Sequence, residues 1–136
     1  MDAIDRIRIA LIDDDELTRT ALRLALPLDT VEVVAEANTG RSGLDACLRL
    51  KPDIVFLDVM MPEMDGLQIL PSIIDALPMT EVLMVTASND RKTIEKAILG
   101  GAASYIVKPF TAGAVADALK RAMANLQRKR NAKTPH

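Results

Sequence analysis

Acidic, hydroxyl and basic side chains lie at the ends of four apolar runs in this 136-residue chain. Asp58 closes one run, and Asp13 and Asp14 directly follow another. Thr86 and Lys108 close two more. In an open parallel sheet, the carboxyl ends of the strands form the crevice in which ligands bind. Carboxylates, a hydroxyl and an ammonium that meet there favour a site for a hard cation and for phosphoryl chemistry.

The acidic residues also have simpler explanations when each is taken alone. Asp13 and Asp14 can cap the positive start of a helix as readily as they can bind a metal, although we assign capping to Asp15 or Glu16. Asp58 can be a turn residue, or it can be a nucleophilic carboxylate that forms an aspartyl-phosphate. Local sequence does not decide between these alternatives.

In isolation, simpler explanations are favoured for the hydroxyl and the ammonium. An ordinary strand residue or helix cap explains Thr86, and a surface lysine explains Lys108. Together with the acids, however, they place the parts of a phosphoryl-transfer site at four strand ends. The prediction of such a site rests on this combination. The remaining apolar run ends in Glu36, which we expect to add little.

Apolar runs that alternate with amphipathic segments predict five strand–helix units. The strands are expected at 7–12, 31–35, 54–57, 82–85 and 104–107. Most are continuously apolar, which is typical of parallel strands covered by helices on both faces. Pro71 is tolerated only in the first turn of a helix, so the third helix is expected to begin near Leu70, after a turn at Asp65-Gly66.

Composition narrows the class of protein. The net charge of −2, from 17 basic and 19 acidic residues, neither supports nor excludes a nucleic-acid surface. Phe56, Tyr105 and Phe110 are the only aromatic residues, so stacking on single-stranded bases is not expected. No signal peptide or membrane-spanning run is found. Cys47, the only cysteine, is expected to be a buried thiol, and a cytoplasmic location is expected.

Four motifs together resemble the receiver domain of two-component response regulators. They are LIDDD at 11–15, DIVFLDVMMPEMDG at 53–66, VTA at 85–87 and GAASYIVKPF at 101–110. The resemblance implies a flavodoxin-like (βα)5 three-layer sandwich with a five-stranded parallel sheet of order 2-1-3-4-5. The receiver would span residues 6–127, and a basic tail at 128–136 is expected to be disordered.

The resemblance also implies the roles of the acidic residues. Asp58 would be the phosphoacceptor. Asp14, Asp58 and the backbone carbonyl of Met60 would hold Mg²⁺ directly, with Mn²⁺ as a substitute, and Asp13 would act through water. Lys108 would pair with Asp58 or with its phosphoryl group.

Further roles follow from the resemblance at the last two strands. Thr86 and the backbone N–H of Ala87 would bind phosphoryl oxygens. Tyr105 would be a rotamer switch coupled to Thr86, and the Lys108-Pro109 bond would be cis.

A receiver would take its phosphoryl group from a sensor histidine kinase or a histidine phosphotransfer protein. It would act on an effector protein or form a homodimer through the face at 91–126, without binding membrane or nucleic acid itself, and it would not be an enzyme. One alternative is the N-terminal receiver of a longer DNA-binding regulator. A haloacid-dehalogenase-type phosphatase is disfavoured because its second acid, two residues after the nucleophile, is here Met60.

Overall fold

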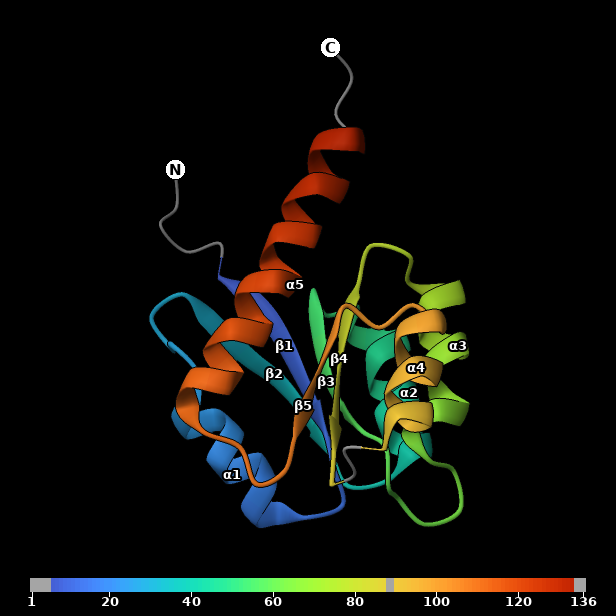
Figure 1. The fold of residues 1–136 in the computed structure, drawn as a ribbon. Helices are drawn as coiled ribbons and strands as arrows, with labels where there is room; N and C mark the ends of the chain where they lie inside the picture. Colours follow the sequence, from blue (N-terminus) through green and yellow to red (C-terminus); the bar gives the residue numbers. More distant parts are fainter. Residues whose placement is uncertain (1–5, 88–89, 134–136) are drawn as a thin grey trace.

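A computed structural model describes residues 6–87 and 90–133, which form five strands that alternate with five helices (Figure 1). The strands are β1 (Ile7–Ile12), β2 (Val31–Ala37), β3 (Ile54–Asp58), β4 (Glu81–Thr86) and β5 (Ser104–Val107). The helices are α1 (Glu16–Ala25), α2 (Gly40–Leu50), α3 (Gly66–Ala76), α4 (Arg91–Leu99) and α5 (Ala112–Lys133). All strand pairs are parallel, and the order β2-β1-β3-β4-β5 confirms the predicted flavodoxin-like topology.

Helices cover both faces of the sheet, with α1 and α5 on one side and α2, α3 and α4 on the other (Figure 1). Successive strand residues therefore enter different cores: Phe56 packs beneath α1 and α5, whereas Leu57 packs on the opposite side. This explains why the central strands are apolar without alternation. Cys47 lies in the second core with no exposed surface, and burial raises the pKa of its thiol to about 11. The expected buried thiol is confirmed.

The third helix begins at Gly66, one turn before its predicted start near Leu70, so that prediction is wrong. Asp65 caps the helix: its carboxylate accepts the Gln68 N–H at 2.9 Å, while Gln68 Oε1 accepts the Asp65 N–H at 2.9 Å. This reciprocal capping box satisfies two donors that would otherwise lack partners. Pro71 consequently lies inside the helix, where one backbone hydrogen bond is missing. The cap and the burial of the helix offset that loss.

The last helix differs from the prediction in the other direction. Helix α5 continues to Lys133, so the expectation of a disordered tail from residue 128 is wrong as far as residue 133. Residues 134–136, with His136, lie outside the described part of the chain. None of the helices among residues 6–87 and 90–133 is long and apolar enough to cross a membrane.

Candidate functional site

The four predicted strand ends meet at one edge of the sheet. Asp58 is the last residue of β3 and is paired in register with Val85, which directly precedes Thr86 at the end of β4. Asp13 follows β1, the other neighbour of β3. Asp13, Asp58 and Thr86 are each 1% exposed. Polar groups that are so deeply buried require hydrogen-bond or charged partners.

Lys108 reaches the acids from the loop after β5. Its Nζ lies 3.0 Å from Asp13 Oδ2 and 3.4 Å from Asp58 Oδ1. Its backbone N–H donates to the Thr86 carbonyl at 2.8 Å, and the Lys108-Pro109 bond is cis, as predicted. Burial alone would lower the pKa of the ammonium, but the two carboxylates outweigh it and the pKa is raised. Lys108 is therefore a fixed positive charge, and it bridges Asp13 and Asp58 rather than pairing with Asp58 alone.

The acids form a compact cluster. One carboxylate oxygen from each of Asp13, Asp14 and Asp58 lies within 4.8 Å of the others. Burial, followed by repulsion from Asp13, raises the pKa of Asp58 to about 7. Asp13 Oδ2 is buried and accepts no hydrogen bond among the described residues, although the Lys108 ammonium lies beside it. Oxygen donors with excess negative charge and an incompletely satisfied oxygen fit a hard divalent cation such as Mg²⁺.

Asp15 caps a helix and is not part of the cluster. Its side chain accepts the N–H of Leu17 at 3.1 Å and the hydroxyl of Thr18 at 2.9 Å. The bonds from Thr18 and Leu17 hold the pKa of this exposed carboxyl below its usual value. The assignment of capping to Asp15 is thus confirmed, which leaves Asp13 and Asp14 for the cluster.

The other predicted site residues lie on β5 and in the segments that follow β3 and β4. The Met60 N–H donates to Asp58 Oδ1 at 3.2 Å, and its side chain points away from the core, with Met60 64% exposed. Ala87 follows Thr86 and lines an open cavity of about 500 Å³ that Lys108 also lines. Tyr105 is paired with Met84, which lies two residues before Thr86 on β4. The side chains of Tyr105 and Thr86 therefore lie on the same face of the sheet. Tyr105 is 39% exposed.

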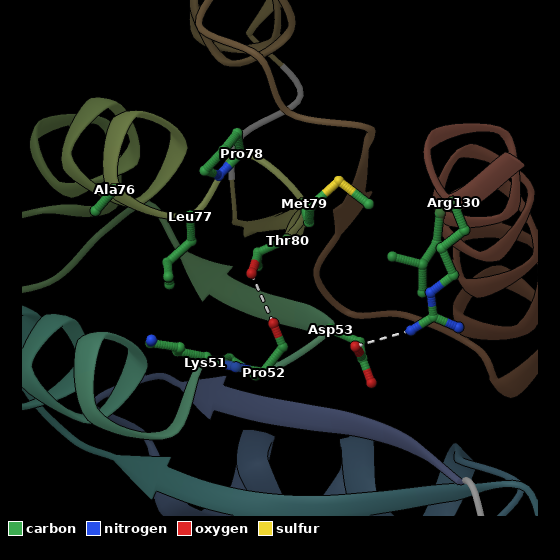
Figure 2. A pocket seen from close by; sticks show the side chains of 10 residues that line it. Lys51, Pro52, Asp53, Ala76, Leu77, Pro78, Met79, Thr80 and Arg130 are labelled. Atoms are coloured by element: carbon green, nitrogen blue, oxygen red, sulfur yellow. Dashed lines mark hydrogen bonds and ion pairs between the residues drawn. The ribbon is translucent and has the colours of Figure 1, made fainter. Parts of the chain in front are cut away.

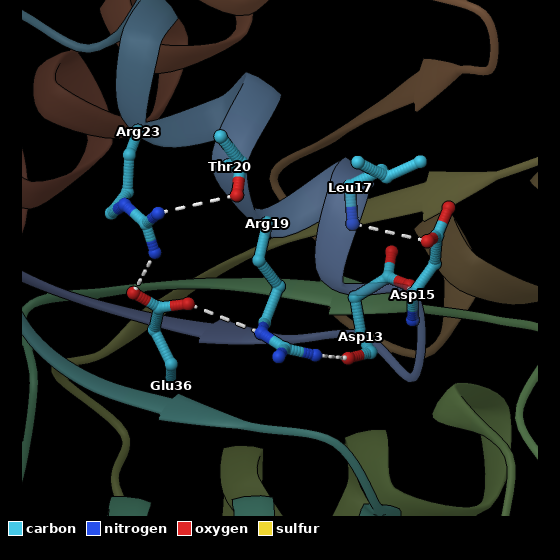
Figure 3. Close-up of polar contacts among 7 residues, drawn as sticks. All are labelled: Asp13, Asp15, Leu17, Arg19, Thr20, Arg23 and Glu36. Carbon is cyan, nitrogen blue, oxygen red and sulfur yellow. Dashed lines mark hydrogen bonds and ion pairs between the residues drawn. The ribbon is translucent and has the colours of Figure 1, made fainter.

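Glu36, from which we expected little, supports the site through α1. It pairs with Arg19 and with Arg23, and the Arg19 guanidinium also donates to the backbone carbonyl of Asp13 (Figure 3). The signal in the sequence was an acid at a strand end together with two arginines four positions apart on the preceding helix, because residues at that spacing share a helix face.

The opposite edge of the sheet holds a second cavity of about 320 Å³ and none of the predicted site residues (Figure 2). Arg130 of α5 lies 3.0 Å from Asp53, and the Thr80 hydroxyl donates to the Pro52 carbonyl at 2.6 Å. The pair formed by Asp53 and Arg130 thus holds α5 to the strands at this cavity. The arrangement is structural.

Comparison with known proteins identifies the family. The family model described as response regulator receiver domain matches residues 9–120. The chemotaxis protein CheY of Listeria monocytogenes is 39% identical over 116 residues, which cover 85% of this chain and 98% of that protein. The response regulator protein VraR of Staphylococcus aureus is 33% identical over 116 residues, which cover 85% of this chain and 56% of that protein.

A solved structure supports the same assignment. The complex of CheX, CheY, BeF3 and Mg from Borrelia burgdorferi matches with a TM-score of 0.77 and 26% identity. The match covers 87% of this chain and 87% of that chain.

Proposed function

This chain belongs to the response regulator receiver family of two-component systems, and we propose that Asp58 is its phosphoacceptor. The observation that carries the proposal is the position of Asp58: a buried carboxylate at a strand end, 3.4 Å from a fixed ammonium and within a cluster of three acids. A carboxylate held in this way can attack phosphorus and form an aspartyl-phosphate. Among the acids of the cluster, Asp58 is the one that ends the middle strand of the sheet, β3.

The surrounding groups would stabilise the phosphoryl group at Asp58. Asp14, Asp58 and the Met60 carbonyl would hold Mg²⁺ or Mn²⁺, with Asp13 acting through water; the ion would neutralise charge on the phosphoryl oxygens. Lys108 would move from its bridge between two carboxylates to a phosphoryl oxygen. The Thr86 hydroxyl and the Ala87 N–H would donate hydrogen bonds to the remaining oxygens. The chain would thus be a self-modifying switch and not an enzyme that turns over a separate substrate.

The donor would be a sensor histidine kinase or a histidine phosphotransfer protein. The output would be a change at the face formed by residues 91–126, which contacts an effector protein or a second copy. Tyr105 supports this proposal because it is partly exposed and is paired with Met84, two residues before Thr86 on the neighbouring strand. The CheY of the Borrelia structure is complexed with a protein partner, with BeF3 and with Mg, which are the kinds of ligand expected for this site.

The alternative of a longer DNA-binding regulator concerns what the receiver is attached to, and not its site. This chain spans nearly all of the Listeria CheY but about half of VraR. The native reading frame beyond His136 distinguishes the two cases, because a DNA-binding module there would make the receiver an input domain.

Incubation with acetyl phosphate and Mg²⁺, followed by intact-mass measurement, tests the phosphoacceptor. We expect one phosphoryl increment in the wild type and in Asp75→Ala, which changes an exposed acid of α3, and none in Asp58→Ala. Chelation of the metal should abolish the increment. Undiminished labelling of Asp58→Ala would show that another residue is the acceptor, and undiminished labelling in chelator would remove the metal from the proposal.

A further inference from the structure

Arg19 connects three elements at the acidic edge of the sheet. From α1, its Nη1 donates to the backbone carbonyl of Asp13, and its Nε donates to Glu36 Oε1 at 3.1 Å (Figure 3). The Arg19 side chain is 14% exposed, so water competes little with these contacts. The planar guanidinium suits this position because its donors point in fixed, separate directions.

The Asp13 backbone and carboxylate are consequently held from several sides. The Asp13 N–H donates to the Ala37 carbonyl at 3.0 Å, and Asp13 Oδ1 accepts the Asp15 N–H at 2.9 Å. Arg19 holds the carbonyl. What remains is Oδ2, which faces the Lys108 ammonium and accepts no hydrogen bond among the described residues. The contacts therefore direct one carboxylate oxygen toward the acidic cluster.

Glu36 sets the direction of Arg19. Its carboxylate, near the end of β2, accepts Arg19 on one oxygen and Arg23 on the other. Arg23 also donates to the Thr20 hydroxyl at 3.2 Å, and within the described part of the chain the hydrogen bonds and ion pairs of its side chain go to Thr20 and Glu36 and not to Asp13. Arg23 thus shares the carboxylate with Arg19 without touching the acidic cluster, which makes it a matched control.

We propose that Arg19, oriented by Glu36, is a positioning residue for the cation site, and that it acts by fixing the Asp13 carboxylate. The proposal rests on the metal binding of the proposed function. Residues that orient metal ligands typically change metal affinity by about 10- to 100-fold when they are replaced.

A purely electrostatic role for Arg19 predicts the opposite sign. Removal of a positive charge near three acids would tighten the binding of a divalent cation. Loss of positioning weakens binding instead, since Asp13 must then be ordered when the ion arrives. The sign of the change in affinity therefore separates the two roles.

Titration of the whole chain with Mg²⁺, followed through amide chemical shifts, gives the dissociation constant of each variant. We expect Arg19→Met to raise the Kd about tenfold. Arg19→Lys keeps the charge but cannot reach both acceptors, so it should also weaken binding, which keeps the test open if Arg19→Met does not fold. Arg23→Met should stay within about twofold of the wild type, because it touches no ligand.

Each outcome decides the matter. Unchanged or tighter binding in the Arg19 variants would overturn the positioning role while leaving the metal site in place. Equal weakening in Arg23→Met would assign the effect to general loosening of α1, and thermal unfolding of both variants would show it. Absence of Mg²⁺ binding in the wild type would overturn the proposed metal site, and this inference with it.

Discussion

Asp58 is in a costly position for a carboxylate. It is buried, and repulsion from Asp13 adds to the burial in raising its pKa to about 7. Lys108 opposes this change but is divided between two acids. A raised pKa in the folded state means that the ionised group destabilises the fold, whereas the protonated group does not. A cation bound beside the ionised Asp58 would therefore offset this destabilisation.

Asp58→Asn should stabilise the metal-free protein, with a benefit that depends on pH. Below the unfolded pKa near 4, the Asp58 side chain is protonated in both the folded and the unfolded state, and the wild type keeps its full stability. The wild type loses this stability as the pH rises through the folded pKa of about 7. The gain of Asp58→Asn over the wild type should thus be small at pH 4 and reach about 4 kcal/mol at pH 8, because a rise of the pKa from near 4 to about 7, which already includes the attraction to Lys108, corresponds to about that free energy. Urea unfolding in chelator measures this.

Mg²⁺ should erase the advantage of Asp58→Asn at pH 8, because the ion stabilises the ionised wild type by binding the folded state. Asp75→Asn, on the exposed side of α3, serves as the control and should show no such pH dependence. A benefit of Asp58→Asn that is constant from pH 4 to 8 would contradict the raised pKa.

At the scale of single elements, two local features of the sequence predict different starting residues for α3. Pro71 indicates a late start, but the capping box of Asp65 and Gln68 begins the helix at Gly66. Gly66 itself is required there, since a Cβ would lie 2.2 Å from the Asp58 carbonyl oxygen. The helix start thus packs directly against the backbone of the proposed phosphoacceptor.

Pro71→Ala should stabilise the fold by about 1 kcal/mol or more, because an interior proline costs a helix about 3 kcal/mol while it also restricts the unfolded chain. Pro71 is exposed, so the substitution removes little packing. Chemical denaturation measures the change. A loss of stability would mean that the ring makes favourable contacts that exceed the missing hydrogen bond.

The C-terminal end of α5 is held by contacts with residues at the amino ends of β3 and β4. Lys129 pairs with Glu81, whose side chain is 5% exposed, and donates to the Pro78 carbonyl at 2.9 Å. Arg130 pairs with Asp53 at a more exposed position. The buried carboxylate depends on its partner, whereas the exposed pair contributes little.

Lys129→Met should destabilise the fold by about 2 kcal/mol, because it leaves the Glu81 carboxylate buried without its partner. Lys120→Met, which changes an exposed lysine of the same helix, should have almost no effect. The double variant Lys129→Met, Glu81→Gln should recover much of the loss. Equal effects of the two lysine variants would show that the buried pair is not needed.

At the scale of the whole molecule, the two edges of the sheet have separate roles. The carboxyl edge holds the acidic cluster, and the opposite edge anchors α5. A signal from Asp58 to the 91–126 face would pass along β4 and β5, where Thr86 and Tyr105 lie on one face of the sheet. Such coupling requires two states that differ in their affinity for the phosphoryl group.

Thr86→Ala should leave Asp58 able to accept phosphate but weaken its coupling to the 91–126 face. We expect the coupling free energy, typically 1–3 kcal/mol, to fall by about 1 kcal/mol. Amide shifts across 91–126 on addition of Mg²⁺ and beryllofluoride report the coupling, and labelling by acetyl phosphate reports acceptance. Undiminished shifts in Thr86→Ala would refute a role for its hydroxyl in the switch.

The sequence by itself determined which chemical groups stand at which strand ends. Apolar runs without alternation place Asp58 and Thr86 at the ends of buried parallel strands, and such ends always share one edge. The sheet order and the cis bond before Pro109 followed from the resemblance and are confirmed. These features are local, or follow from rules of chain connection, so they can be predicted without coordinates.

Only the tertiary structure decided which charged side chains pair with one another. Lys108 lies closer to Asp13 than to Asp58, and Glu36 orients Arg19, because side chains from different elements compete for the same partners in space. The order of the α5 end likewise depends on the burial of Glu81, far from it in sequence. Pairing of this kind depends on distances and burial across the fold, and residue types along a chain do not carry that information.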